Sequence, residues 1–282
     1  MEFAMSLLIT PQQLNSRLKD PGTIVLDATL PPVGVTPPVD TRARYLAKHI
    51  PGAAFFDIDE ISDRTTQLPH MLPNEREFAK AVSFLGVGSD MTVVLYEQEG
   101  VFSAPRAWWM LKTFGAEDVV ILDGGLKAWE EAGYATHSGF VTCKPAKFTP
   151  RFDAEAVISF DELQQAIAAG ETILDARSKG RFDGTAPEPR PISSGHMPSS
   201  INIPFLELTE NGRFKSVRDL KALFEAKGVD RKKPIITSCG SGVTAAVLAF
   251  GLEMIGAKHV SLYDGSWCEY AQHPEAKIEK AQ

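Results

Sequence analysis

The stretch Thr172-Ile-Leu-Asp-Ala-Arg177 decides the fold, because an earlier part of the chain repeats it as Thr23-Ile-Val-Leu-Asp-Ala28. Three further pairs of motifs follow in the same order, with an offset that shortens slowly along the chain. They are His49-Ile-Pro-Gly-Ala53 with His196-Met-Pro-Ser-Ser200, Val93-Val-Leu-Tyr-Glu97 with Ile235-Ile-Thr-Ser-Cys239, and Val119-Val-Ile-Leu-Asp-Gly-Gly125 with Val260-Ser-Leu-Tyr-Asp-Gly-Ser266. Motifs repeated in one order indicate two copies of the same domain.

Each copy consists of short apolar runs that alternate with helical segments. Runs such as 93–96, 173–174 and 260–263 are brief and bounded by Gly, Asp or Pro, which is typical of strands buried on both faces of a parallel sheet. Amphipathic stretches such as 74–85 and 217–227 lie between the strands. The alternation predicts the α/β class, with two tandem doubly wound domains, each built on a mostly parallel central sheet flanked by helices.

The chain of 282 residues suits two domains of ordinary size. We expect an N-terminal domain over residues 1–138, a linker over 139–153 and a C-terminal domain over 154–282. The linker has weak periodicity and contains Gly139, Pro145 and Pro150.

Composition and charge exclude several classes of protein. A net charge of −7 gives no electrostatic reason to bind nucleic acid or an anionic membrane. Apolar runs fall short of the ~20 residues that a membrane span needs, and residues 1–5 lack the basic start of a signal peptide. Three scattered cysteines predict neither a disulfide framework nor a zinc site. We therefore expect a reduced, cytoplasmic protein without a metal.

Cys239 lies in the loop Cys239-Gly-Ser-Gly-Val-Thr244, between a buried strand and a helical run over 245–252. Its two glycines permit a backbone conformation in which successive N–H groups converge on one anion, and the helix adds its positive N-terminal end. Both effects favour a thiolate, which is the nucleophilic form of cysteine, and a persulfide anion on the same sulfur. A lone cysteine is more often an inert packing residue, and this interpretation is favoured for Cys143 and Cys268.

A cysteine loop of this kind also serves phosphate-ester hydrolysis, where an arginine at the end of the loop grips the phosphate. Ala245 stands at that position here. The phosphatase interpretation therefore lacks its main cation.

The two copies together resemble the tandem-domain rhodanese superfamily. The resemblance extends over nearly the whole chain, including the segments 103–109 and 181–190. The loop Cys239–Thr244 looks like that of the 3-mercaptopyruvate sulfurtransferase branch. Thiosulfate sulfurtransferases of the family typically carry Arg and Lys at the positions of Gly240 and Ser241. One departure is Pro198-Ser-Ser200, where the family usually has Pro-Gly-Ala.

The resemblance implies that only the C-terminal copy is catalytic, because Glu97 stands in the first copy where Cys239 stands in the second. It implies that Cys239 takes sulfur from 3-mercaptopyruvate as a persulfide and releases pyruvate. A thiol acceptor such as thioredoxin or glutathione, or cyanide in the test tube, then removes the sulfur. No cofactor is implied, and a monomer is expected.

The resemblance also assigns residues to the substrate site: Arg181, Arg190 and the loop residues Gly240, Gly242, Val243 and Thr244. Guanidinium groups suit a carboxylate beside a carbonyl oxygen. Considered alone, each arginine is more often a solvated charge or an ion-pair partner, and Glu188 lies close in sequence to both.

A proton relay of Ser241, His70 and Asp59 is implied as well, and it would deprotonate the substrate thiol or supply a proton to the enolate. The alternative is that His70 anchors a proline-bounded loop and Ser241 only donates to the persulfide. Two alternatives for the whole protein also stay open. One is a thiosulfate sulfurtransferase, and the other is a sulfur-binding or regulatory module without turnover.

Overall fold

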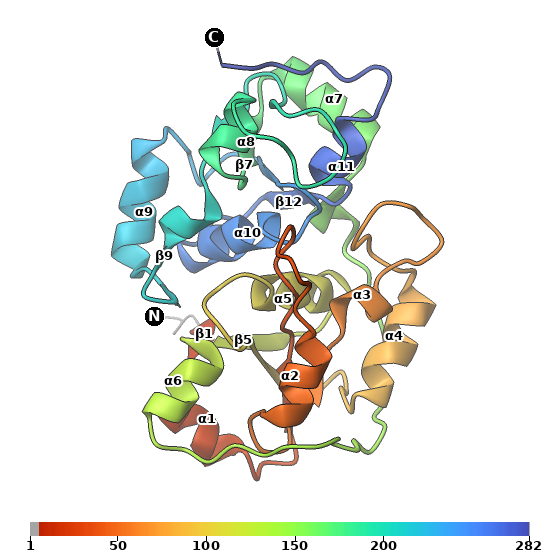
Figure 1. The fold of residues 1–282 in the computed structure, drawn as a ribbon, viewed down its shortest axis with the longest axis vertical. Helices are drawn as coiled ribbons and strands as arrows, with labels where there is room; N and C mark the ends of the chain where they lie inside the picture. Colours follow the sequence, from red (N-terminus) through yellow and green to blue (C-terminus); the bar gives the residue numbers. More distant parts are fainter. Residues whose placement is uncertain (1–5, 282) are drawn as a thin grey trace. The chain divides into compact units, whose positions relative to one another are not determined.

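Each of the two repeats folds into a five-stranded sheet of parallel strands, and the two sheets have the same topology. The first sheet has the strand order β1-β5-β4-β2-β3 and the second has the order β6-β12-β11-β7-β8. Neighbouring strands in both sheets run parallel. This computed structural model, shown in Figure 1, describes residues 6–281. The expected α/β class with tandem doubly wound domains is confirmed.

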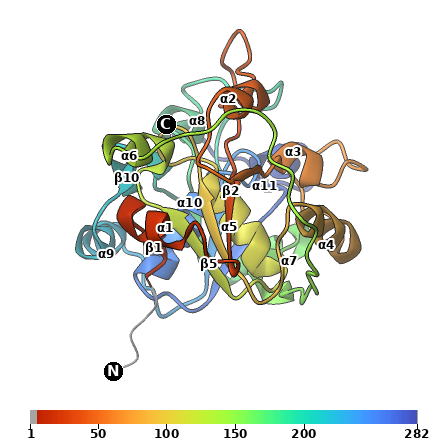
Figure 2. The same ribbon diagram turned by 90° about the horizontal axis from the view of Figure 1, so that it is seen from below.

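The first sheet is flanked by helices on both faces. Its strands are β1 (Leu8–Ile9), β2 (Thr23–Asp27), β3 (Ala54–Phe55), β4 (Thr92–Tyr96) and β5 (Asp118–Leu122). Its helices are α1 (Pro11–Arg17), α2 (Thr41–Ala47), α3 (Ile58–Ile61), α4 (Glu75–Phe84), α5 (Ala104–Thr113) and α6 (Gly125–Glu131). Figure 2 shows α1 and α6 on one side of β2 and β5, and α4 and α5 on the other.

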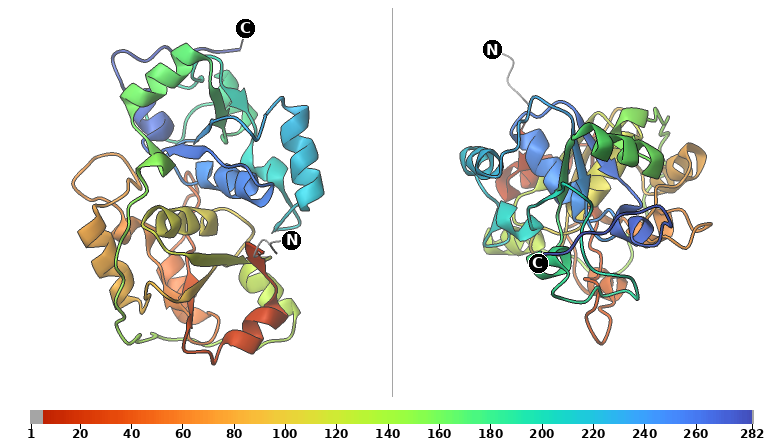
Figure 3. Two further views of the ribbon diagram at one scale, coloured as in Figure 1. Left: turned by 180° about the vertical axis from the view of Figure 1, so that it is seen from behind. Right: turned by 90° about the horizontal axis from the view of Figure 1, so that it is seen from above.

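The second sheet repeats this arrangement. Its strands are β6 (Val157–Ile158), β7 (Thr172–Asp175), β8 (Ile201–Asn202), β11 (Ile235–Ser238) and β12 (Val260–Tyr263), and a separate hairpin is formed by β9 (Thr209–Glu210) and β10 (Arg213–Phe214). Its helices are α7 (Phe160–Ala169), α8 (Lys179–Asp183), α9 (Val217–Ala226), α10 (Ala245–Met254) and α11 (Ser266–Tyr270). In Figure 3, α7 and α11 lie on one side of this sheet, and α9 and α10 on the other.

The central strand β11 and the helix after it form the core of the second sheet. All four residues of β11 are buried, and so is every residue from Ala245 to Leu252 in α10. A helix that is apolar all round must be covered on all sides, and α10 packs against β11 and β12. The sequence from 239 to 244 is thereby held between two rigid elements.

Clustering by contact divides the chain into two compact units. One contains the residues up to Ile61 with 73–152 and 211–213, and the other contains 62–72, 153–210 and 214 onward. The backbone N–H of Leu72 donates to Asp264 Oδ2 at 2.7 Å. The contacts place 62–72 with the second unit and 211–213 with the first, so the units are not continuous in sequence. The linear boundaries expected at 138 and 153 therefore stay a prediction.

The departure from the family pattern at Pro198-Ser-Ser200 leaves the turn intact. Ser199 adopts φ +60°, and Gly52 at the equivalent place in the first copy adopts φ +78°. This left-handed conformation is open to glycine and costs other residues energy. Ser199 therefore takes on a glycine conformation with a side chain in place.

No helix among residues 6–281 is long and apolar enough to cross a bilayer. Residues 1–5, on which the expectation about a signal peptide rests, lie outside the described residues.

We predict that Leu174→Ala lowers the free energy of unfolding by about 2–5 kcal/mol, because it leaves a cavity beside the central strand. Leu174 lies in β7, is 0% exposed and pairs with Thr237 of β11. Urea denaturation measures the loss. Leu206→Ala is the matched control, because that leucine is 65% exposed. Equal stability of the two variants would contradict the assignment of Leu174 to the core.

Candidate functional site

Cys239 directly follows β11, at the carboxyl edge of the second sheet. β11 pairs with β7 on one side and with β12 on the other. Ligands of open α/β sheets bind at this edge. Cys239 is 2% exposed, so its sulfur is shielded from bulk water.

The loop curls around the hydroxyl of Ser266. The N–H groups of Cys239 and Gly242 donate to Ser266 Oγ at 3.2 and 3.1 Å, and Gly242 adopts φ +78°. Within residues 6–281, the N–H groups of Ser241, Val243 and Thr244 donate to no backbone or side-chain acceptor. The loop thus retains several amide donors that can serve an anion.

The first copy places a carboxylate at the position of Cys239. The side chain of Glu97 accepts hydrogen bonds from the N–H groups of Phe102, Ser103 and Ala104 at 2.8–3.1 Å. It also accepts one from Ser103 Oγ at 3.2 Å. The helices α5 and α10 begin at Ala104 and Ala245, so these amides correspond to residues 243–245 at the start of α10. The first copy therefore fills its own anion site with a side chain.

Burial raises the pKa of Glu97 to about 7, although the three amide donors and the Ser103 hydroxyl counteract the shift. The carboxyl is 4% exposed. Removal from water disfavours its charged form more than the four hydrogen bonds favour it.

His70 and Ser241 of the expected relay are in contact. Nδ1 of His70 lies 3.0 Å from Ser241 Oγ and 3.3 Å from the Ser241 carbonyl oxygen. His70 is 9% exposed and adopts φ +64°, a strained conformation for a residue other than glycine. Asp59 lies exposed on α3 and belongs to the other unit. Its place in the relay stays a prediction.

Arg181 is paired with Glu188. Its Nε and Nη2 atoms donate to Glu188 Oε2 at 3.0 and 2.5 Å. The other carboxylate oxygen of Glu188 accepts from Arg177 Nη1 at 2.8 Å. Glu188 therefore fixes Arg181, while the side chain of Arg181 remains 24% exposed.

Arg177 is the buried partner of Glu188 in this network of arginines and acids. It is 2% exposed, bonds both carboxylate oxygens of Asp175 and lies 4.1 Å from the ring of Trp267. Burial acts to lower the pKa of Arg177, but the charges of Asp175 and Glu188 outweigh burial and raise it. The guanidinium thus stays charged in the interior.

Arg181 also lies against the loop of Cys239. A Cβ atom on Gly240 would lie 2.8 Å from Arg181 Nη2, so a side chain at position 240 requires Arg181 to move. Arg190 is half-buried and forms no ion pair within the part of the chain that the structure describes. Burial raises the pKa of Cys268, and the charge of Arg190 partly offsets this, which indicates that Arg190 lies near this edge of the sheet.

Ser266 is a structural partner of the site that sequence reasoning did not single out, and Glu188 is the nearby acid that it named beside the two arginines. Ser266 accepts two N–H groups of the loop, and Glu188 orients Arg181. A signal for Ser266 existed in the repeat, because the first copy has Gly125 at that position. A serine hydroxyl present in only one of two copies is a candidate for a role specific to that copy.

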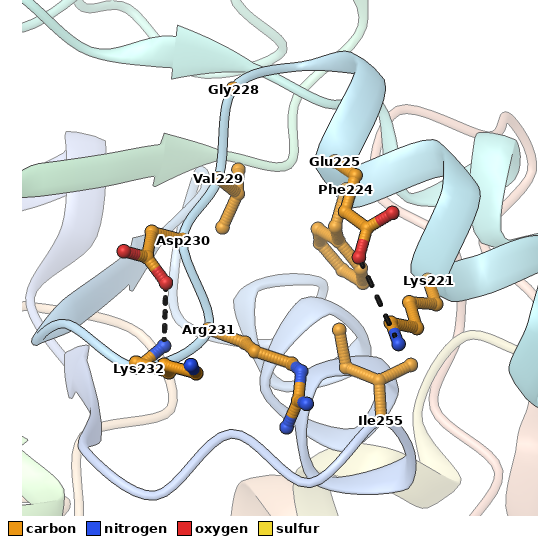
Figure 4. A pocket seen from close by; sticks show the side chains of 9 residues that line it. All are labelled: Lys221, Phe224, Glu225, Gly228, Val229, Asp230, Arg231, Lys232 and Ile255. Carbon is orange, nitrogen blue, oxygen red and sulfur yellow. Dashed lines mark hydrogen bonds and ion pairs between the residues drawn. The ribbon is translucent and has the colours of Figure 1, made fainter.

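A cavity of about 500 Å³ lies elsewhere on the second unit, and Figure 4 shows the side chains that line it. Lys221 and Glu225 face each other beside it, and none of its lining residues belongs to the loop 239–244. Among residues 6–281, no group of three or more His, Cys, Asp or Glu side chains is placed to hold a metal ion.

Comparison with known proteins identifies the family. A family model described as "Rhodanese-like domain" matches residues 10–132 and 159–273. The chain belongs to the rhodanese-like domain family. Both copies expected from the repeat are thus recognised separately.

Relatives over the whole length are sulfurtransferases. The chain is 41% identical to the 3-mercaptopyruvate sulfurtransferase of Escherichia coli K12, across 94% of this chain and 95% of that protein. It is 39% identical to the mitochondrial thiosulfate/3-mercaptopyruvate sulfurtransferase 1 of Arabidopsis thaliana, across 98% and 78%. The crystal structure of SseA from Escherichia coli matches with a TM-score of 0.86 and 40% identity, across 93% and 99%. The expected relation to the 3-mercaptopyruvate sulfurtransferases is confirmed, and the chain is an enzyme of the sulfurtransferase class.

We predict that Glu97→Gln removes a pH-dependent part of the stability of the first unit. The pKa of Glu97 is higher in the folded chain (about 7) than its ordinary value of 4.5. Its contribution is therefore fully present below pH 4.5 and is lost as the pH rises through 7. The free energy of unfolding of the wild type, measured relative to Glu97→Gln, should fall by about 3 kcal/mol from pH 4.5 to pH 8.

Urea denaturation followed by tryptophan fluorescence measures this difference, since Trp108, Trp109 and Trp129 lie in the first unit. Glu99→Gln is the control, because the side chain of Glu99 is 75% exposed and belongs to the same loop. A pH-independent difference for Glu97→Gln would show that the carboxyl does not titrate in this range.

Proposed function

We propose that the chain transfers sulfur from 3-mercaptopyruvate to a thiol acceptor through a persulfide on Cys239, with release of pyruvate. The observation that carries the proposal is the loop 239–244, with a cysteine at the carboxyl end of the central strand and amide donors around it. Glu97 supports it, because the equivalent loop of the first copy directs three N–H groups at the oxygens of an acid side chain.

The chemistry has two steps. The thiolate of Cys239 attacks the sulfur of 3-mercaptopyruvate, and the carbon–sulfur bond breaks with its electron pair passing to the enolate of pyruvate. A proton then converts the enolate to pyruvate. In the second step the acceptor thiolate attacks the outer sulfur of the persulfide, which returns Cys239 to its thiolate and leaves the sulfur on the acceptor.

His70 and Ser241 are proposed to move the proton. Their contact at 3.0 Å supports a transfer between the imidazole and the hydroxyl, and Asp59 is proposed as the third member. The alternative, in which His70 only fixes the backbone of the loop, draws on the 3.3 Å contact with the Ser241 carbonyl oxygen.

The two arginines are proposed to bind the substrate carboxylate and the adjacent carbonyl. Arg190 has no acidic partner among the described residues, so its guanidinium is available to an anion. Arg181 is oriented by Glu188 and lies beside Gly240. The loop residues Gly240, Gly242, Val243 and Thr244 are proposed to hold the sulfur end.

The second candidate function is sulfur transfer from thiosulfate through the same cysteine. It is supported by the Arabidopsis relative, whose name includes both sulfur donors. The close approach of Arg181 to Gly240 argues against it, because the arginine that thiosulfate sulfurtransferases carry at this position would need that space. The relatives named as sulfurtransferases argue against the other alternative, a sulfur-binding module without turnover. Thioredoxin-like acceptors, a monomeric state and a cytoplasmic location also belong to the proposal.

We predict that the wild type releases pyruvate from 3-mercaptopyruvate and a thiol, and that Cys239→Ser reduces this turnover to background. Serine lacks a sulfur that can form a persulfide. Pyruvate release is measured with lactate dehydrogenase, and sulfur release from thiosulfate is measured at the same donor concentration. Cys143→Ser is the control and should keep full turnover. Faster transfer from thiosulfate would favour the second candidate, and no pyruvate from the wild type would contradict the proposal.

We predict that Arg190→Ala raises KM for 3-mercaptopyruvate about ten-fold or more, since a charge-assisted hydrogen bond to the carboxylate is lost. Arg218→Ala, which removes an exposed arginine of α9, is the matched control. Steady-state kinetics of pyruvate release measure both. An unchanged KM for Arg190→Ala would remove Arg190 from the substrate site.

A further inference from the structure

Ser266 connects the loop of Cys239 to the end of β12. We propose that Ser266 is a positioning residue for sulfur transfer: its hydroxyl fixes the curl of residues 239–242 and so aims the remaining amide donors of the loop at the sulfur. The inference rests on the proposed persulfide chemistry and adds to it the residue that shapes its anion site.

Every hydrogen-bonding capacity of this hydroxyl is used. Ser266 Oγ accepts from the N–H groups of Cys239 at 3.2 Å and Gly242 at 3.1 Å, and it donates to the carbonyl oxygen of Tyr263 at 2.8 Å. A hydroxyl offers one donor and two acceptor positions. Because Cys239 and Gly242 are three residues apart, both can reach one oxygen only if the chain between them curls.

The backbone at Ser266 is strained. Ser266 has φ +49° and is 0% exposed. A residue other than glycine in this region raises the energy of the fold, and such a conformation persists where the surrounding structure over-determines it. A glycine would adopt the same φ without this cost. The serine side chain must therefore make a favourable interaction that glycine cannot make.

The first copy shows the arrangement without the hydroxyl. Gly125 stands at the equivalent position with φ +60°. Leu126 N–H donates to Glu97 O at 3.0 Å, as Trp267 N–H donates to Cys239 O at 3.0 Å. The difference is one of space: a Cβ atom on Gly125 would lie 2.2 Å from the Glu97 carbonyl oxygen.

The backbone of the first copy therefore lies where the serine side chain would be. In the second copy the loop lies far enough from residue 266 to leave space for a side chain, and the serine hydroxyl accepts two N–H groups of the loop. The copy with the nucleophile has the hydroxyl, and the copy with a carboxylate in the anion site has a glycine. Ser266 is accordingly a structural difference between the loop that carries Cys239 and the loop that is filled by Glu97.

The test compares Ser266→Gly with the wild type. Glycine relieves the strain at φ +49° and is the residue of the first copy, so this variant should fold, while the two N–H groups that lose their acceptor lower its thermal midpoint. We expect kcat for pyruvate release to fall about ten-fold or more, because the amide donors of the loop no longer point at the sulfur. KM for 3-mercaptopyruvate should stay unchanged, because Arg181 and Arg190 are untouched.

A second measurement does not depend on the donor. The rate constant for alkylation of Cys239 by iodoacetamide at pH 7 should fall in Ser266→Gly as well. Ser238→Ala is the matched control, because Ser238 precedes Cys239 and its buried hydroxyl has no hydrogen-bond partner among the described residues. This variant should keep the wild-type kcat and alkylation rate.

The outcomes separate the two proposals. A wild type that releases no pyruvate contradicts the proposed function, while a slower alkylation of Ser266→Gly still supports the positioning role. Wild-type kcat and a wild-type alkylation rate in Ser266→Gly would overturn the inference. An equal loss in Ser238→Ala would also overturn it, because any change in the interior next to Cys239 would then have the same effect.

Discussion

A set of backbone amides that converge beyond the central strand is the constraint on which the rest of this structure depends. In the first copy these amides bind the carboxyl group of Glu97, which receives three N–H groups and one hydroxyl. In the second copy Cys239 stands at the same place, and part of the amide set is left to an incoming charge. One fold thus provides one site filled by its own side chain and one whose amide donors lack a side-chain acceptor among the described residues.

The surroundings of Cys239 follow from this constraint. Ser266 takes the N–H groups of residues 239 and 242, so the loop keeps a fixed curl. Arg181 is held by Glu188 close to the loop, so that a side chain at position 240 would displace it. Glu188 balances the charge of Arg181 and also accepts from Arg177, which is paired with the buried Asp175. Arg181 and the loop of Cys239 are therefore parts of one network within the second unit.

Much of the fold could be predicted from the sequence, since both strands and turns leave local signals. The repeated runs ending in Asp27 and Asp175 became β2 and β7, because strands buried on both faces must be short and apolar. The place of Cys239 was also predictable, since glycines mark the turn after β11. The pairing of Arg181 with Glu188 was not, because sequence proximity does not distinguish an ion pair from two solvated charges. Nor was the grouping of 62–72 with the second unit, which depends on contacts between residues far apart in the chain.

The central claim is that Cys239 carries the sulfur. The most direct measurement is peptide mass mapping of the wild type after incubation with 3-mercaptopyruvate, without an acceptor thiol. The account predicts the mass of one additional sulfur atom on the peptide that contains Cys239, and its loss when a thiol is added. Release of pyruvate with no added sulfur on that peptide, or with the sulfur on Cys143 or Cys268, would contradict it.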